Sequence, residues 1–466
     1  METIRFGTDG WRAPLEEFTT PRVRMVGQAV ATYLADEGLE GPIAVGYDAR
    51  ETSRGFAEEL TRVLCANGFD VLLSDRDRPT PLVAYAIVDR DLAGGLVITA
   101  SHNPPEYNGV KFIPHDGAPA LPAVTDAIAD RLAEPDPLPE DDHGTAREVD
   151  FAEPHADAAM ALVEGITGSA DLSELTVAYD AIHGSGRGTT DALLERAGAS
   201  VKRLRCERDP DFGGGSPEPA AQNLDALIAT VTDGDSDGVV DLGIANDGDA
   251  DRIAVVTPER GYLNENLFFA ALYEYLLEDE SGSVVRSVST TYLIDRVAEA
   301  HGETVHEVPV GFKWVARAMA ERDALIGGEE SGGFTVRGHV REKDGVLMAL
   351  LAGAMHAEEP LDERIDRLLE DHGTVVQDKT SVDCPDDEKD RVLSDLEDEI
   401  PETVAGTTVE DVNTADGFKL LLADGSWLLV RPSGTEPVLR VYAEASDAER
   451  VRELLEAGEE LLEPLV

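Results

Sequence analysis

Lysine is scarce in this sequence, and acidic residues far outnumber basic ones. Only seven of the 39 basic side chains are lysines, against 94 aspartates and glutamates, so the 466-residue chain carries a formal net charge of −55. This charge argues against nucleic acid and anionic membranes as partners, because both are negative themselves. Since the acid excess runs along the whole chain, we expect a protein adapted to concentrated salt, as in a halophile. At 1 M salt the Debye length falls to ~3 Å and carboxylate repulsion is screened. An ordinary acidic protein is the alternative.

Cysteines and long apolar runs are also scarce. The three cysteines, Cys65, Cys206 and Cys384, lie far apart, and their odd number argues against a disulfide framework. The longest apolar run, 347–355, is far shorter than the ~20 residues that span a bilayer. The N-terminus lacks the basic-then-apolar pattern of a signal peptide. These absences predict a cytoplasmic protein and leave its oligomeric state open.

Short apolar segments alternate with helical ones, which predicts α/β layers. The pattern predicts strands at 43–46, 96–99, 177–179 and 242–245, and helices at 22–36 and 55–67. The last ~90 residues predict a smaller α+β domain, in line with a length that favours several domains. Its expected elements are strands near 419–423 and 427–431 and an amphipathic helix at 446–462.

Three breaks divide the chain. Residues 133–150 are rich in proline and acid, which is typical of a linker. A second break lies near 256–262, where a strand ends, and a third near 371–380, after a helix. We therefore expect four domains, at 1–148, 149–256, 257–372 and 373–466.

The first of four polar loops, 99–112, follows an apolar run at 94–98. Ser101 lies where this buried strand emerges, and ligands of α/β sheets favour the carboxyl ends of strands. A serine hydroxyl there can act as a nucleophile, with His102 or Lys111 handling protons. A capped turn is the alternative, since serine, asparagine and proline are common turn formers.

The second loop places three aspartates directly after the strand 242–245. Asp247, Asp249 and Asp251 can converge on a hard divalent cation through their oxygens, and Mg²⁺ is usual when phosphate is also a ligand. Without a cation, carboxylates so close together would repel one another. A solvated acidic turn is the alternative.

The third and fourth loops, 327–333 and 431–437, combine glycine with polar side chains. In the third, glycines allow the backbone to approach a ligand while Glu329 and Ser331 bond to it, which suits sugar hydroxyls. In the fourth, Arg431, two hydroxyls and glycine amides form a compact phosphate cradle. Simple turns are the alternatives. Together the four loops supply the parts that phosphoryl transfer on a sugar phosphate requires.

In these loops the chain resembles the α-D-phosphohexomutases, which include phosphoglucomutase, phosphomannomutase and phosphoglucosamine mutase. The resemblance covers essentially the whole chain, with the motifs in the family's order. The matching segments are 6–12, 99–112 (TASHNPPEYNGVKF), 213–219, 247–252 (DGDADR), 309–313, 328–333 (GEESGG) and 431–437 (RPSGTEP).

The resemblance implies four domains around a central cleft: three related α/β units with mixed sheets and a smaller C-terminal α+β domain. It also implies an isomerase that acts as an intramolecular phosphotransferase. Ser101 would rest as a phosphoserine, give its phosphoryl group to a hexose 1- or 6-phosphate, and take the other phosphate back from a bound hexose 1,6-bisphosphate. The bisphosphate would also serve as activator.

The resemblance further implies a role for each motif residue. One Mg²⁺ per active site would be held by Asp247, Asp249, Asp251 and a phosphoserine oxygen of Ser101. The catalytic group would also include His102, Lys111 and Arg12. The implied substrate-binding residues are Arg252, Lys313, Glu329, Ser331, Arg431, Ser433, Gly434 and Thr435. Three of the seven lysines, Lys111, Lys313 and Lys343, lie in or near these motifs, which favours a locally positive cleft for an anionic sugar phosphate.

Glucose phosphate is the first expectation for the substrate, and mannose phosphate is a further one. Phosphoglucosamine mutase is the alternative within the family, although Glu330 and the Gly332-Gly333 pair depart from its usual sugar loop. A haloacid-dehalogenase-type phosphotransferase, with Asp247 as nucleophile, is an alternative of another class. A non-catalytic sugar-phosphate or cation-binding protein is a third, but every loop keeps its key residue.

Overall fold

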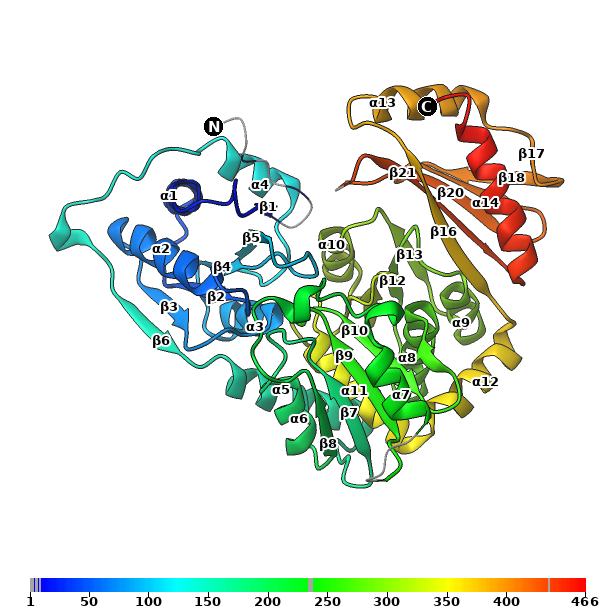
Figure 1. Cartoon of the computed structure of the whole chain (residues 1–466), viewed down its shortest axis with the longest axis horizontal. Coiled ribbons are helices and arrows are strands. Elements are labelled where there is room, and N and C mark those ends of the chain that lie inside the picture. The colour runs from blue at the N-terminus through cyan, green and yellow to red at the C-terminus, as the bar shows by residue number, and fades with distance from the viewer. Residues whose placement is uncertain (1–3, 5–6, 8–9, 234–237, 435) are drawn as a thin grey trace.

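The computed structural model describes the chain except for residues 1–3, 5–6, 8–9, 234–237 and 435. Four domains follow one another, each built around one sheet: three α/β domains with mixed sheets and a C-terminal domain with an antiparallel sheet. Figure 1 shows the first and last domains at the two ends of the molecule, with the two middle domains between them. This architecture confirms the predicted fold class.

The first sheet has the strand order β1-β5-β4-β2-β3-β6. Its strands are β1 (Trp11–Pro14), β2 (Ile43–Tyr47), β3 (Val71–Ser74), β4 (Gly94–Ile98), β5 (Tyr107–Pro114) and β6 (Ala146–Val149). Its helices are α1 (Thr20–Asp36), α2 (Ser53–Ala66), α3 (Thr80–Asp89) and α4 (Pro122–Ala129). The predicted elements of this domain are confirmed to within about two residues at each end. In α1 the buried residues Val23, Val26, Val30 and Leu34 form the expected apolar stripe.

The expected linker at 133–150 is only partly irregular. Its last residues form β6, which pairs in parallel with β3 and closes the first sheet. The β6 side chains Ala146, Arg147 and Glu148 are exposed. An edge strand with one paired side needs little apolar burial, which explains why its composition predicted a linker.

The second sheet has the order β11-β10-β9-β7-β8. Its strands are β7 (Thr176–Asp180), β8 (Ser200–Leu204), β9 (Leu242–Asn246), β10 (Ile253–Thr257) and β11 (Gly261–Leu263), and its helices are α5 (Ala152–Thr167), α6 (Thr190–Arg196) and α7 (Asp225–Thr232). The break expected at 256–262 is the turn of the β10–β11 hairpin. The second sheet therefore continues past residue 256, to Leu263.

The third sheet has the order β13-β12-β14-β15. Its strands are β12 (Val284–Ser287), β13 (Val305–Val308), β14 (Ile326–Gly328) and β15 (Phe334–Val336). Its helices are α8 (Glu265–Asp279), α9 (Leu293–His301), α10 (Phe312–Arg322), α11 (Gly345–Glu358) and α12 (Leu361–His372). Helix α11 contains the apolar run 347–355 and packs against α5, α6, β9 and β10 of the second domain. A helix that is apolar all round must be buried, and α11 accordingly joins the cores of the two middle domains.

The C-terminal sheet is antiparallel, with the order β16-β21-β20-β19-β18-β17. Its strands are β16 (Val376–Asp383), β17 (Thr403–Val404), β18 (Thr407–Asn413), β19 (Phe418–Leu422), β20 (Trp427–Pro432) and β21 (Val438–Ala445), and its helices are α13 (Lys389–Glu399) and α14 (Ala448–Leu462). Of all the helices that the structure describes, none has the length and apolar character that crossing a bilayer would need.

Candidate functional site

The Ser101 loop leaves the sheet at the end of β4, as the sequence predicts. Ser101 is fully buried and has a φ of 51°, in the left-handed region that a non-glycine residue rarely adopts. Its N–H donates to Thr99 Oγ1 at 2.8 Å, and its hydroxyl donates to Asp247 Oδ2 at 2.8 Å. The hydroxyl also lies 3.2 Å from His102 Nδ1. The strained turn therefore aims the Ser101 hydroxyl at the aspartate loop of the second domain.

A buried arginine, Arg50, holds this loop in place. Its guanidinium donates to the carbonyl of Ser101 at 3.0 Å and to that of Tyr107 at 3.1 Å, and it also bonds the carbonyls of Asn103 and Pro104. Asp48 Oδ2 accepts from Arg50 Nε at 3.0 Å and supplies the opposite charge. Because four of the five guanidinium donors bond carbonyls of this loop, Arg50 stabilises its turn.

The three aspartates lie in the turn from β9 to β10, and all three side chains are fully buried. Ligand oxygens from Asp247, Asp249 and Asp251 lie within 4.8 Å of one another. Asp247 Oδ1 accepts the backbone N–H groups of Asp251 and Arg252 at 3.0 and 3.1 Å. Asp249 Oδ2 accepts from Thr80 Oγ1 at 2.6 Å. The backbone thus fixes the direction of the Asp247 carboxylate, and Thr80 that of Asp249.

Two lysines face the aspartates. Lys111 Nζ lies 3.0 Å from both Asp249 Oδ2 and Asp251 Oδ2, and Lys343 Nζ lies 3.0 Å from Asp251 Oδ2. Burial raises the pKa of Asp249, but the charges of Lys111 and Lys343 and the hydrogen bonds from Thr80 and Lys111 together outweigh it and hold that pKa below its ordinary range. Burial and the charges of Asp251 and Asp249 raise the pKa of Asp247 well above its ordinary value. The lysines therefore balance only part of the negative charge.

The donor set fits a hard divalent cation. Asp249 Oδ1 and Asp251 Oδ1 are buried and accept no hydrogen bond, so each keeps an open lone pair. Three carboxylates with open oxygens, one of them hydrogen-bonded to Ser101, are the ligands that Mg²⁺ prefers in phosphoryl-transfer sites. A cation would also remove the electrostatic cause of the raised Asp247 pKa.

Arg12, His102 and Arg252 lie beside this cluster. The charge of Arg252, then burial and the charge of Arg12, lower the pKa of His102, so its imidazole is neutral. Arg12 Nη1 donates to Asn103 Oδ1 at 3.2 Å. Arg252 Nε lies 3.9 Å from Asp251 Oδ1 and is buried without a hydrogen-bond partner. The predicted catalytic residues and Arg252 thus come together in one place.

The glycine-rich third loop follows β14. Glu329 Oε1 accepts the Gly311 N–H at 2.7 Å, which connects the loop to the start of α10, where Lys313 lies. Gly332 has a φ of 83°, and a Cβ there would lie 2.6 Å from the carbonyl oxygen of Ile253 in β10. Only glycine permits this approach of the third loop to the strand that follows the aspartates. Ser331, in the same loop, is half-buried.

The fourth loop lies in the C-terminal domain. Arg431 Nε donates to Asp416 Oδ2 at 2.8 Å, and Asp416 also accepts the Val310 N–H at 3.2 Å. Ser433 is buried and Gly434 is exposed, whereas Thr435 lies outside the described residues. Asp416 therefore links Arg431 to Val310, in the segment before α10, and the bond of Arg431 is not to the Asp247–Asp251 loop.

Two residues at the site were missed from the sequence, Arg50 and Thr80. Arg50 follows the buried strand β2, at the same sheet edge as Ser101, and this position was the available signal. Nothing in the sequence marks Thr80, which begins α3 and reaches Asp249 across 169 residues of chain. Lys343 was noted in sequence only for lying after the third loop.

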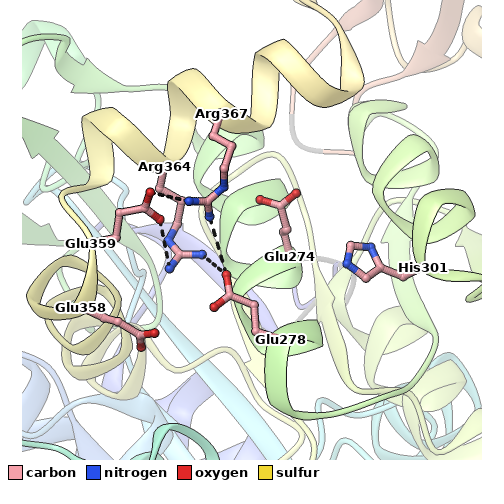
Figure 2. Close-up of a pocket in the computed structure, with 7 residues that line it drawn as sticks. All are labelled: Glu274, Glu278, His301, Glu358, Glu359, Arg364 and Arg367. Atoms are coloured by element: carbon pink, nitrogen blue, oxygen red, sulfur yellow. Dashed lines mark hydrogen bonds and ion pairs between the residues drawn. The ribbon is translucent and has the colours of Figure 1, made fainter.

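A cavity of about 450 Å³ lies elsewhere, between α8, α9, α11 and α12 (Figure 2). Glu274, Glu278, His301, Glu358, Glu359, Arg364 and Arg367 line it. Figure 2 shows Arg364 and Arg367 turned toward Glu278 and Glu359, and the Arg364–Glu278 pair is 2.5 Å long. None of these residues belongs to a predicted motif.

Comparison with models of protein families shows which family this chain belongs to. Models for phosphoglucomutase/phosphomannomutase domains match residues 3–138 (α/β/α domain I), 156–261 (domain II), 264–372 (domain III) and 380–460 (C-terminal domain). The chain belongs to the α-D-phosphohexomutase family. Phosphohexomutases are isomerases that act as intramolecular phosphotransferases, so the predicted enzyme class is confirmed and the dehalogenase-type alternative is wrong.

Similar proteins carry several substrate names. The chain is 34% identical to a probable phosphoglucosamine mutase of Methanothermobacter thermautotrophicus, over 99% of this chain and 98% of the relative. It is 32% identical to a phosphoglucomutase/phosphomannomutase of Thermococcus kodakarensis, over 98% of each chain. A solved structure described as a phosphomannomutase from Thermus thermophilus superposes with a TM-score of 0.85 at 32% identity, over 99% of each chain. These names leave the sugar of this phosphohexomutase open.

Proposed function

We propose that this phosphohexomutase interconverts hexose 1-phosphate and hexose 6-phosphate, with glucose as the first substrate and mannose as a further one. The observation that carries the proposal is the 2.8 Å hydrogen bond from the buried Ser101 hydroxyl to Asp247. It places a nucleophile against a carboxylate cluster that still has two open oxygens. A phosphoserine on Ser101 would lie at this same point.

Asp247, Asp249, Asp251 and a phosphoryl oxygen on Ser101 would hold Mg²⁺, which supplies charge neutralisation for the transferring group. In the first half-reaction a sugar hydroxyl oxygen attacks the phosphorus on Ser101 and the P–Oγ bond breaks. The sugar proton leaves to a base and Oγ gains a proton. The same bonds form and break in reverse at the other phosphate after the 1,6-bisphosphate turns over.

Lys111 and His102 are the groups proposed to move these protons. Lys111 lies between two aspartates, and the neutral His102 has Nδ1 3.2 Å from Ser101 Oγ. The neutral imidazole has a nitrogen lone pair for a proton, and a bound anionic phosphate would offset the charges of Arg12 and Arg252 that oppose its protonation. Arg12 and Arg252 add positive charge beside His102, where an anionic sugar phosphate would enter.

Substrate recognition is proposed for the third and fourth loops. Glu329 and Ser331 would bond sugar hydroxyls in either orientation of the hexose, with Lys313 beside them. The backbone and side chains of the fourth loop would hold the phosphate that does not react. The proposed phosphate ligands are Arg431, Ser433, Gly434 and Thr435.

Glucosamine phosphate is the second candidate substrate, because similar archaeal proteins bear that name. A panel of glucose, mannose and glucosamine 1-phosphates, with Mg²⁺ and a trace of the matching 1,6-bisphosphate in molar KCl, separates the candidates by kcat/KM. The highest value with glucosamine phosphate would overturn the glucose assignment.

Ser101→Ala tests the mechanism. We expect loss of turnover by at least about a thousandfold with the fold intact, because no hydroxyl remains to carry the phosphoryl group. Ser173→Ala, at an exposed serine before β7, is the matched control. Phosphate on the enzyme should resist hydroxylamine, and label that hydroxylamine removes would indicate an aspartyl phosphate instead. The expected cytoplasmic location and the role of the bisphosphate as activator stay predictions.

A further inference from the structure

A second group of buried polar side chains lies next to the proposed active site. His155 of α5, with His339 and Asp344 ahead of α11, forms what we call the His–Asp–His triad. Asp344 Oδ2 lies 2.6 Å from His155 Nε2 and 2.9 Å from His339 Nε2, and the two nitrogens are 3.4 Å apart. The side chains are at most 1% exposed.

Hydrogen bonds account for this geometry better than a metal ion does. Zinc bonds of ~2.0–2.1 Å in a tetrahedron keep ligand atoms about 3.3 Å apart, well beyond the 2.6 Å that separates His155 from Asp344. A metal-bound histidine also donates its other ring N–H to a partner, whereas His155 Nδ1 is buried without one. An arrangement in which each histidine donates its Nε2–H to Asp344 Oδ2 accounts for both short distances without a metal.

The other oxygen of Asp344 fixes the start of α11. Asp344 Oδ1 accepts the N–H groups of Val346 and Leu347 at 3.0 and 2.8 Å, which caps the helix. The carbonyl of Gly345 accepts from Asn246 Nδ2, in β9, at 3.1 Å. Asp344 thus has both oxygens engaged, and its backbone cannot shift without breaking the cap.

Lys343 immediately precedes this fixed residue and reaches Asp251 at 3.0 Å. The triad also connects three domains. Tyr85 of α3 in the first domain stacks on His339, with ring centroids 5.4 Å apart, and meets His155 edge-on at 5.7 Å. His155 belongs to the second domain, whereas His339 and Asp344 belong to the third.

We propose that His155 and His339 are positioning residues, which hold Lys343 at the aspartate cluster through the two hydrogen bonds to Asp344. The expected loss of turnover rests on the proposed function, whereas the expected change at Lys343 does not. When one imidazole donor is lost, Asp344 loses a side-chain hydrogen bond, and the segment that carries Lys343 gains freedom.

Paired substitutions separate positioning from folding. His155→Leu removes the donor at similar volume, and His155→Gln keeps an N–H near the position of Nε2. The control is His372→Leu, because His372 Nε2 lies 3.0 Å from Glu274, which lines the cavity of Figure 2, and neither residue belongs to the triad or to the aspartate loop. His372→Leu therefore loses the same kind of histidine–carboxylate hydrogen bond as His155→Leu.

We expect His155→Leu to lower kcat about tenfold and to raise the Mg²⁺ concentration for half-maximal rate about fivefold, with the sugar-phosphate KM changed less than about twofold. His155→Gln should recover kcat to within about threefold of the parent enzyme. In the metal-free protein, reductive methylation of Lys343, followed by mass spectrometry, should run at least about fivefold faster in His155→Leu than in His372→Leu.

Equal effects of His155→Leu and His372→Leu on kcat and on Lys343 methylation would overturn the proposal. Stoichiometric Zn²⁺ binding to the parent protein that His155→Leu abolishes would also overturn it, in favour of a metal site. If the parent protein turned over no sugar phosphate while Lys343 methylation still rose in His155→Leu, the proposed function would fail and the positioning role would stand.

Discussion

Two carboxylate clusters in this protein differ in what faces them. Asp247, Asp249 and Asp251 face Lys111 and Lys343 and are fully buried. In the cavity of Figure 2, by contrast, Glu278 and Glu359 face Arg364 and Arg367, with the two carboxylates 38% and 25% exposed. The first cluster keeps open oxygens that are fully buried, whereas the arginines contact both oxygens of Glu359 and one oxygen of Glu278.

The difference lies in the shape of the cation. Arginine presents a planar fork that can bind both oxygens of one carboxylate side by side, which leaves that carboxylate no oxygen for another ligand. Lysine is a point charge that can balance two carboxylates through one oxygen each, as Lys111 does. Lys111 faces Asp249 and Asp251 and leaves one oxygen of each carboxylate available to a ligand.

Metal removal tests the comparison most strongly. We expect chelation of Mg²⁺, or Asp249→Asn, to lower kcat by about a thousandfold, because charge on the transferring phosphoryl group loses about 4 kcal/mol of stabilisation. The measurement is turnover after dialysis against EDTA and after Mg²⁺ is restored.

Glu278→Gln is the matched control in the glutamate cluster, since it also replaces a carboxylate by an amide beside a cation. Its turnover should stay within about twofold of the parent enzyme. Equal losses in the two variants would contradict the distinction between the clusters.

The fold was predictable because each domain alternates strongly apolar strands with helices. The boundaries were less predictable for a physical reason. β6 is an exposed edge strand, and β11 is a three-residue return strand, so neither buries enough apolar surface to show in the sequence. Helix α11 was predicted only as an apolar run, because its burial depends on α5 and α6 of another domain.

The site was predictable where its residues are contiguous. Ser101 with His102, and the three aspartates, follow strands directly, so strand polarity alone brings them to one edge. Thr80 and His155 were not predictable, because their partners Asp249 and Asp344 lie 169 and 189 residues away in the chain. Such pairs are fixed by domain packing, which no local pattern encodes.

The effect of salt on stability tests the charge of the whole chain rather than that of one cluster. If the net charge of −55 is an adaptation to salt, KCl should stabilise the fold by several kcal/mol between 0.1 and ~2 M, because screening weakens carboxylate repulsion. Thermal unfolding across a KCl series measures this. Maximum stability in dilute buffer would contradict salt adaptation and leave an ordinary acidic protein.

Arg364→Met tests the glutamate cluster by removing one of the two arginines that face it. Arg364 is 1% exposed, pairs with Glu278 and lies 4.8 Å from the ring centroid of Tyr275. Its loss should cost about 2 kcal/mol of unfolding free energy, since two partly exposed carboxylates lose their counter-charge and a buried stem loses packing. Urea unfolding measures the loss, and kcat should not change. A large loss of kcat with unchanged stability would place this cavity in the catalytic cycle.

Another buried cation, Lys419, gives the smallest expected effect and the one that depends most on pH. Burial first, then the charge of Arg286, lowers the pKa of Lys419 to about 8, against the partial opposition of Glu307. Lys111, by comparison, faces two aspartates. Lys419 also contacts the rings of Tyr292 and Trp427, at 4.1 and 4.3 Å, so it joins the third and fourth domains.

The sign of the Lys419 effect follows from proton binding. Between pH 8 and ~10.4, the ordinary lysine pKa, the unfolded chain holds a proton that the folded chain has released. The contribution of Lys419 to stability therefore rises with pH in this window, by about 1 kcal/mol per pH unit. The difference in unfolding free energy between the parent protein and Lys419→Met, measured at about pH 8.5 and ~9.5, isolates this contribution from other groups. A difference that stays constant would mean that Lys419 keeps its proton in the folded chain across this window, and that Glu307 compensates the burial of its charge.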